Sequence, residues 1–315
     1  MAYTAPSDTG NRLSTSKRIE LLEPPDNDDV EIVLDTDTYN EIDDQFALVY
    51  AILSDTIDVE AVYAAPFHNQ KSDGPADGME KSYDEIIRVL KLLECPDTKD
   101  LAFRGAMEYM DSTDELVKNP ATDDLIRRAR GRNDDDPLYV VAIGAPTNVS
   151  LAIERVPEII ENIVVVWLGG HPLSWHTAEE FNLLQDLQAS RILFDSGVPN
   201  VLVPCKNVAE HVRTTVPELE SHLSDQGELS EYLLEIFTEY RQYYDRNVWS
   251  KEIWDMAPIA YLLKHEWVPT NLAHSPRLSE DLRYGHDTSR HFIRVAMDTH
   301  RDYIFDDFFK KLGNR

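Results

Sequence analysis

Short runs of mostly apolar residues, separated by helical patterns, are the feature that most constrains how this chain can fold. The runs are Val30–Leu34, Val59–Ala65, Leu138–Ile143 and Ile163–Leu168. Their apolar residues are nearly continuous, which is typical of strands that are buried on both faces. Strands of this kind alternate with helices in folds that cover both faces of a mostly parallel sheet. We therefore predict an α/β fold with an open, mostly parallel sheet and helices on both faces.

The segments between these runs show apolar residues at helical spacing. The spacing predicts helices over Asp44–Leu53, Tyr83–Leu93 and Val149–Val156. The charged segment 108–136 fits either a helical excursion or a mobile flap. Residues 1–29 are polar and contain two adjacent prolines, so we predict a flexible or loosely docked N-terminal extension. Residues 30–315 would then form a single domain.

The charge of the chain excludes several classes of partner. Its 315 residues include 58 acidic residues and 30 Lys or Arg, which gives a formal net charge of −28 at pH 7. Nucleic acids and anionic membrane surfaces bind basic footprints, so we expect neither as a partner. The carboxylates are spread along the whole chain, and high salt would screen their mutual repulsion. This composition therefore indicates a halophilic organism with a salt-rich cytosol.

Other sequence features bear on the compartment. The N-terminal stretch lacks the apolar core of a secretory signal, and no apolar run approaches the length of a membrane span. The two cysteines, Cys95 and Cys205, are far apart and suggest neither a disulfide framework nor a zinc site. We expect a cytoplasmic protein with inert thiols.

The sequence "VLDTDTYNEIDD" (residues 33–44) places five carboxylates directly after the first predicted strand, where parallel sheets bind their ligands. No Lys or Arg occurs between Ile19 and Gln70, so no residue nearby in the sequence compensates these charges. Crowded like charges raise one another's pKa or require a cation. Oxygen ligands without Cys or His favour a hard ion, Ca²⁺ or Mg²⁺. Asp43 alone could cap the following helix, but that role would not explain Asp35 and Asp37.

Six segments, taken in order, resemble the nucleoside hydrolases, the inosine-uridine-preferring family. They are "LDTDTYNEIDDQFALVYAI", "VAIGAPTNVSLAI", "VVVWLGG", "AEEFNLLQD", "IWDMAPIAYLL" and "VAMDTHRDYIFDDFF". The resemblance covers the chain from about residue 30 to its end. It implies a Rossmann-like single domain, bound Ca²⁺, a small-molecule nucleoside substrate and assembly into a homodimer or homotetramer.

The resemblance also implies roles for individual residues. Ca²⁺ would be bound by the side chains of Asp37, Asp44 and Asp255 and by the carbonyl of Thr147. The ribose would be bound by Asp43, Glu180 and Asn182, with Asn69 close to it. His68 stands beside Asn69 where the family usually has Gly, and Ser174 aligns with a family Asn. Asp35 would be a buried partner of the metal ligands.

The reaction implied by the resemblance is hydrolysis of the N-glycosidic bond of a ribonucleoside, which gives ribose and a free base. Such a reaction passes through a ribosyl cation of oxocarbenium character. A bound metal lowers the pKa of its water and orients the sugar hydroxyls. Asp37 is the expected general base, which takes the proton of the attacking water.

The chain departs from the family pattern at the leaving-group side. The late His-Asp element of the family reads Trp254-Asp255 here, and tryptophan is not an acid. His176 is our candidate replacement, with His171 and His68 as alternatives. Tyr244, Trp249 and Trp254 are candidates to line the base pocket. The loop between Asp37 and Asp43 is also two residues longer than usual. Base preference therefore stays open.

Alternative functions also fit parts of the sequence. Asp-x-Asp after a buried strand also opens the haloacid-dehalogenase-like phosphatases, in which Asp35 would be the nucleophile and Mg²⁺ the cofactor. A second alternative is a protein that binds a nucleoside or sugar through Ca²⁺ without turnover. A third is hydrolysis of a modified or nucleotide-derived riboside.

Overall fold

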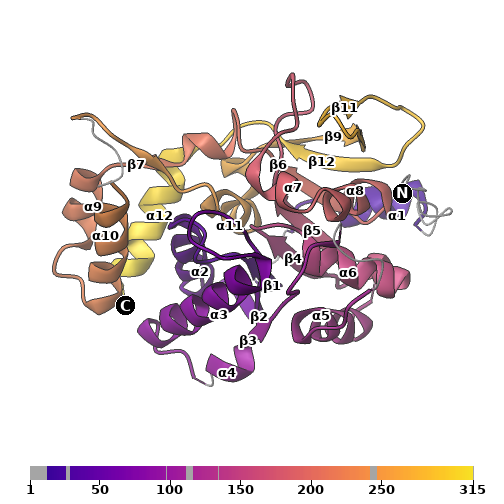
Figure 1. The fold of residues 1–315 in the computed structure, drawn as a ribbon. Helices are drawn as coiled ribbons and strands as arrows, with labels where there is room; N and C mark the ends of the chain where they lie inside the picture. Colours follow the sequence, from indigo (N-terminus) through magenta and orange to yellow (C-terminus); the bar gives the residue numbers. More distant parts are fainter. Residues whose placement is uncertain are drawn as a thin grey trace.

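An eight-stranded sheet runs through the centre of the protein (Figure 1). The computed structural model describes residues 13–25, 29–96, 98–110, 116–133, 135–241 and 247–314. The strands, in their order across the sheet, are β3 (Ala102–Arg104), β2 (Ile57–Ala64), β1 (Val30–Thr36), β4 (Leu138–Ala142), β5 (Ile163–Leu168), β6 (Asn200–Val203), β12 (Phe292–Ala296) and β9 (Thr270–His274). All pairs are parallel except β12 with β9. The predicted α/β class and the mostly parallel sheet are confirmed.

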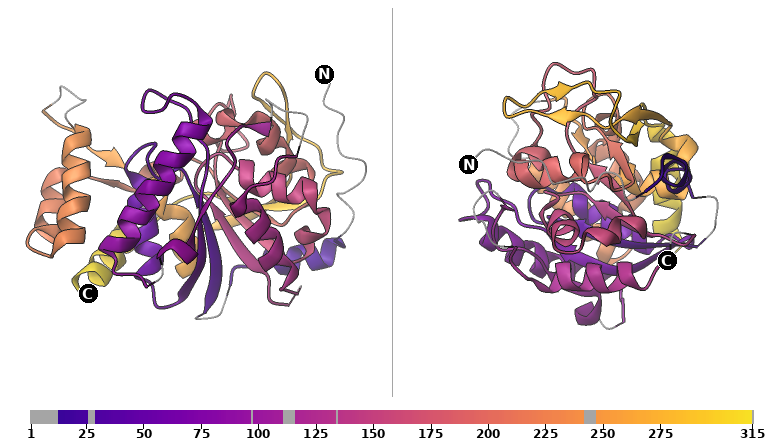
Figure 2. Two further views of the ribbon diagram at one scale, coloured as in Figure 1. Left: turned by 60° about the horizontal axis from the view of Figure 1, so that its bottom comes forward. Right: turned by 90° about the vertical axis from the view of Figure 1, so that its right-hand side faces the viewer.

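Helices cover both faces of the sheet, as Figures 1 and 2 show. They are α1 (Thr15–Leu21), α2 (Asp43–Ile52), α3 (Pro75–Leu92), α4 (Thr98–Leu101), α5 (Pro120–Arg130), α6 (Thr147–Arg155), α7 (Phe181–Gln185), α8 (Leu187–Asp195), α9 (Val216–Leu223), α10 (Glu228–Arg241), α11 (Met256–Leu263) and α12 (Arg301–Gly313). Short 3-10 turns occupy Pro157–Glu161, Ala209–His211 and His265–Trp267. Two small antiparallel pairs complete the elements, β10 (Arg277–Leu278) with β11 (Tyr284–Gly285) and β7 (Arg213–Thr214) with β8 (Lys251–Glu252).

Alternate residues of each central strand enter two separate cores. In β1, Ile32 and Leu34 pack into the core under α2, α3 and α11, whereas Val33 packs into the core under α5, α6 and α8. Side chains of a strand point alternately to its two faces, so a strand covered on both sides must be apolar throughout. This requirement explains why the strands appeared in the sequence as nearly continuous apolar runs.

The segment 108–136, which the sequence left unassigned, contains α5 in its described part. Asn119 caps this helix, because its side chain accepts a hydrogen bond from the Thr122 amide. Its apolar side packs on the sheet through Ala121, Leu125 and Ala129. Residues 111–115 and 134 lie outside the described part of the chain.

The N-terminal helix α1 is docked on the domain. Arg18 is buried and its guanidinium donates to the Gly197 carbonyl. In return, Arg294 on β12 donates to the Leu22 carbonyl and to the Glu23 carboxylate at 3.0 Å. Leu21 and Leu22 belong to the core. We therefore propose that the folded unit begins no later than residue 13.

The strand order brings the two halves of the sheet together at β1 and β4. The chain leaves β1 toward β2 on one side, and later strands add beyond β4 on the other. Ligands of open α/β sheets bind at such a switch point, outside the carboxyl ends of the strands. Across the described residues, no helix combines the length and the apolar character needed to cross a membrane.

Candidate active site

A cavity of about 330 Å³ lies at the carboxyl ends of the central strands. The loop after β1 contributes to its lining, as do Ile143 after β4, Leu168 at the end of β5, and Cys205 and Lys206 after β6. The start of α7 and the residues just before α11 close it from other sides. Its volume is in the range of small-molecule sites, roughly 300–1,000 Å³.

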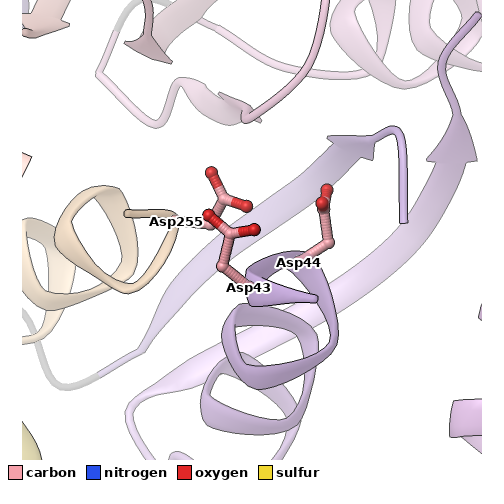
Figure 3. A group of neighbouring side chains, drawn as sticks. All are labelled: Asp43, Asp44 and Asp255. Atoms are coloured by element: carbon pink, nitrogen blue, oxygen red, sulfur yellow. The ribbon is translucent and has the colours of Figure 1, made fainter. Parts of the chain in front are cut away.

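Three buried carboxylates gather in this cavity. Asp43 and Asp44 form the first turn of α2, and Asp255 directly precedes α11. One oxygen from each lies within 4.8 Å of one from the others. Figure 3 shows the carboxylates of Asp43 and Asp255 next to each other, with that of Asp44 on the same side of α2. The partial positive charge at the N-terminus of α2 stabilises two carboxylates there, but it does not neutralise them.

Burial and mutual repulsion raise the pKa values of these carboxylates. Desolvation, with the nearby Asp43 charge, raises the pKa of Asp44 to about 8. Desolvation also raises the pKa of Asp43 to about 6, although Lys251 acts against this shift. The pKa of Asp255 lies well above its ordinary value for the same first reason, reinforced by Asp43 and Asp44. A divalent cation would stabilise the charged forms of these three carboxylates and so lower their pKa values.

Two further aspartates follow β1 and extend the cluster. Asp37 lines the cavity, and its Oδ2 is buried without a hydrogen-bond partner. Gly144 packs closely against this side chain. A Cβ on residue 144 would lie 3.1 Å from the Asp37 carboxyl carbon. Asp35 lies behind it, with one oxygen bonded to the Asn148 amide at 2.8 Å and the other unpaired. The free lone pairs of such an oxygen can accept a hydrogen bond or coordinate a cation.

A distant lysine supplies part of the positive charge that the local sequence lacks. Lys251 on β8 is buried, and its Nζ lies 2.5 Å from the Glu41 carboxylate in the loop after β1. Desolvation alone would lower the pKa of Lys251, but the charges of Asp43 and Glu41 outweigh it and raise that pKa. The lysine is therefore charged and compensates one side of the cluster, while Asp37 and Asp44 keep raised pKa values.

Glu180 and Asn182, predicted to bind the sugar, line the cavity and are held rigidly. Glu180 caps α7 by accepting hydrogen bonds from the amides of Asn182 and Leu183, and it also accepts one from Gly170 at 2.8 Å. Gly170 has φ +62°, a conformation that favours glycine. The Asn182 amide nitrogen donates to the carbonyls that end β4 and β5. Both side chains are thus fixed in place before any substrate arrives.

Thr147 and Asn69 lie outside the cavity lining. Thr147 begins α6, is fully buried and donates its hydroxyl to Asp186 at 2.8 Å. The Asn69 side-chain amide donates to Asn40 at 2.6 Å, and Asn40 lines the cavity. Neither residue is itself among the residues that line it.

The structure does not bring His68, Ser174 and His176 into the cavity. All three are exposed and lie outside its lining. The histidine that lines it is His171, which is buried and contacts Trp175 edge to face. Desolvation lowers the pKa of His171, so its imidazole is neutral near pH 7.

The three aromatic candidates for the base pocket also differ in whether they line the cavity. Trp254 lines the cavity. Trp249 instead packs against Phe237, with ring centroids 5.1 Å apart. Tyr244 lies outside the described residues. Both cysteines are free; Cys205 lines the cavity, and burial together with Glu180 raises the pKa of its thiol.

Several cavity residues were not selected from the sequence. They are Asn40, Glu41, Ile143, Leu168, Glu179, Phe181, Cys205 and Lys206. Asn40 and Glu41 lie inside the acidic motif itself, so their position was a usable signal. Lys206 follows β6, a four-residue strand that we did not predict, so its place at the carboxyl edge could not be inferred.

Comparisons with known proteins agree with this geometry. Among curated relatives, the pyrimidine-specific ribonucleoside hydrolase RihA of Klebsiella pneumoniae is 26% identical over 249 residues, covering 71% of this chain and 77% of that protein. Among solved structures, the purine-preferring ribonucleoside hydrolase of Gardnerella vaginalis has a TM-score of 0.73 at 18% identity, covering 90% of this chain and 98% of that one.

A plant nucleoside hydrolase, PpNRh1, has the same fold with a TM-score of 0.72 at 19% identity, covering 92% of this chain and all of that one. The sequence matches the family described as inosine-uridine preferring nucleoside hydrolase over residues 32–305. This match removes the phosphatase alternative. The chain belongs to the inosine-uridine preferring nucleoside hydrolase family and is an N-glycosidase.

Proposed function

We propose that the protein hydrolyses ribonucleosides in a Ca²⁺-dependent reaction that gives ribose and the free base. The observation that carries the proposal is the group of buried carboxylates in the cavity. Asp43, Asp44 and Asp255 approach one another within 4.8 Å, and the described cavity lining contains no arginine. A set of buried oxygen donors with raised pKa values fits a hard divalent cation.

The ion would be held by Asp37, Asp44 and Asp255, with the Thr147 carbonyl as a further ligand. The unpaired Oδ2 of Asp37 supports its place in this set. Asp43 would accept a hydrogen bond from a ribose hydroxyl. When bound, Ca²⁺ lowers the pKa of a coordinated water and orients the sugar hydroxyls. Ca²⁺ is favoured over Mg²⁺ because it binds to carboxylate sites of flexible geometry, whereas Mg²⁺ demands stricter octahedral geometry.

Residues of the chain would accept the proton of water, bind the ribose and stabilise its developing charge. Asp37 accepts the proton of the attacking water as the C1′–O bond forms. Glu180 and Asn182 fix the ribose, because their own hydrogen bonds hold them in place. The surrounding carboxylates stabilise the positive charge that develops on the sugar. His176 is not assigned the role of leaving-group acid, because its side chain is exposed and outside the cavity lining.

The test is to incubate the protein with a panel of ribonucleosides and measure the release of reducing sugar. We expect turnover with Ca²⁺ and loss of turnover with a chelator, restored by added Ca²⁺. Calorimetric binding of nucleosides without any sugar release would instead favour a binding protein. Restoration by Mg²⁺ but not by Ca²⁺ would contradict the choice of ion.

The remaining expectations from the sequence stay predictions. These are a halophilic source, a cytoplasmic location, a homodimer or homotetramer and a role in nucleoside salvage. The net charge of −28 supports the first of them. Dialysis into low salt should unfold a halophilic protein, and full stability there would contradict this expectation. Light scattering in high salt would give the oligomeric state.

A further inference from the structure

The departing base of this enzyme faces a cavity without a protonated histidine. When the C1′–N bond breaks, its electron pair stays on the base, and either a proton or a positive charge must stabilise it. Trp254 stands at the acid position and cannot donate a proton for this purpose. His171, the histidine in the described cavity lining, is buried and neutral near pH 7.

Lys206 supplies a positive charge in the same cavity. Of the described residues that line it, Lys206 is the one whose side chain is a lysine or arginine. Its Nζ lies 5.5 Å from the ring centroid of Trp254, a cation–π distance. The Lys206 ammonium group also forms an ion pair with Glu210 at 3.2 Å. His171 and Lys206 both line the cavity, and the Lys206 charge contributes to lowering the pKa of His171, after burial as the main cause.

Charges of opposite sign lie at different places in the cavity. Asp37, Glu41, Asp43 and Asp44 follow β1 or begin α2, whereas Lys206 follows β6, three strands further along the sheet. The other carboxylates of the lining, Glu179, Glu180 and Asp255, precede α7 and α11. A bound nucleoside has a similar division in the transition state, because positive charge develops on the sugar and negative charge on the base. Fixed charges that match developing charges lower the barrier without reorganisation during the reaction. The sugar would lie over the carboxylates, and the base would extend past Trp254 toward Lys206.

We propose that the base leaves as an anion that Lys206 stabilises directly, so that no acid has to protonate it; this inference rests on the proposed hydrolase function. The C1′–N1 bond breaks with its electron pair on N1, delocalised onto the ring carbonyl oxygens. Water provides the hydroxyl for C1′, and its proton goes to Asp37. The base takes a proton from solvent after release. The substrates favoured are ribosides of 2-oxopyrimidines such as uracil, whose carbonyl lies beside the departing nitrogen.

The test compares two substrates in matched variants. Uridine needs help with its leaving group, whereas 4-nitrophenyl β-ribofuranoside releases a phenolate that is already stable. For Lys206→Met we expect kcat/KM on uridine to fall by roughly 10²–10³-fold, as for the loss of one charge-stabilising donor. On the nitrophenyl substrate the fall should stay below about tenfold, because sugar binding and water attack are intact. Lys206→Arg keeps the charge and should retain most activity on uridine.

The control variant is Lys264→Met. Lys264 also lies near a tryptophan ring, 5.8 Å from the centroid of Trp267, but outside the cavity lining. It should leave both activities unchanged. Equal losses on both substrates in Lys206→Met would overturn the proposal, and so would unchanged hydrolysis of uridine. A wild-type enzyme that cleaves purine ribosides but not uridine would overturn it while sparing the proposed function. Failure on every riboside would remove the proposed function itself.

Discussion

Asp124 on α5 and Asp44 on α2 are both buried aspartates, yet their surroundings differ. Asp124 accepts hydrogen bonds from Arg127 and Arg128 and from the Tyr63 hydroxyl. Although desolvation acts against it, these partners lower the pKa of Asp124. Asp44 accepts a hydrogen bond from Thr36, and its pKa is raised to about 8. The first aspartate is paired with cations of the chain, whereas no ion pair of the second occurs in the part of the chain that the structure describes.

The neighbours of each aspartate repeat this contrast. Around α5, Arg128 and Arg132 both contact Glu60, so acids and arginines form a network on the far side of the sheet. At the cavity, Lys251 pairs with Glu41, and no ion pair of Asp37, Asp44 or Asp255 occurs within the described residues. In a chain with a large acidic excess, the scarce cations mark structural carboxylates. The cavity carboxylates left without one are those proposed above to bind Ca²⁺.

The largest expected effect is on activity. Asp37→Ala removes the proposed general base and one proposed metal ligand, so we expect sugar release to fall by at least roughly 10²–10⁴-fold. Asp123→Ala serves as the control, because Asp123 is an exposed aspartate on α5. Unchanged activity of Asp37→Ala would refute its assignment as the base.

The next effect concerns stability at the paired site. Asp124→Ala leaves Arg128 with Glu60 as its ion-pair partner and removes the acceptor of the buried Tyr63 hydroxyl, so we expect a loss of about 3 kcal/mol in the free energy of unfolding. Urea titration in high salt measures this loss. Calcium should stabilise the variant as much as it stabilises the wild type. If the calcium response disappeared with Asp124, the two sites would not be independent.

A smaller effect is expected from calcium itself. A ligand that binds the folded state alone at 100 times its Kd adds about 2.7 kcal/mol to the free energy of unfolding. Thermal unfolding with Ca²⁺ or chelator measures this shift. Asp44→Asn should abolish most of it. A full shift in that variant would place the ion elsewhere.

The last effect is a pH dependence of the metal-free protein. The pKa values of Asp43 and Asp44, about 6 and about 8, exceed the ordinary value of 3.8. At pH values between the ordinary pKa and the raised pKa of each group, the folded state holds more protons than the unfolded chain. The free energy of unfolding therefore falls as pH rises through this range. We expect the melting temperature in chelator to fall from pH 5.5 to pH 8.5, as a scan would show. Bound Ca²⁺ should flatten that slope, whereas a rising melting temperature in chelator would contradict the raised pKa values.

The sequence predicted the frame of the fold well. Strands β1, β2, β4 and β5 were identified because burial on both faces makes them apolar throughout. Strand β6 was missed because four residues are too few for a periodic signal. Helix α5 was missed because its charged side, with Arg127, Arg128 and Arg130 in the last turn, hides a narrow apolar stripe.

The candidate site could be predicted only in part. Asp37, Asp43 and Asp44 lie within one short motif of the sequence, and Asp255 was placed by the resemblance of its segment to the family. Contacts between distant segments leave no pattern in the local sequence, so the Lys251–Glu41 ion pair could not be predicted. The exposure of His176 was equally hidden, because a loop position does not reveal which of two nearby histidines turns inward.

The docking of α1 has a practical consequence for anyone who shortens this chain. A variant that starts at residue 30 would lose the carbonyl and carboxylate that receive the Arg294 guanidinium, and Leu21 and Leu22 would leave a bare apolar groove beside β12. Such a truncated protein should aggregate on expression. Trimming only the first 12 residues keeps every one of these contacts and is the safer starting point for crystallisation.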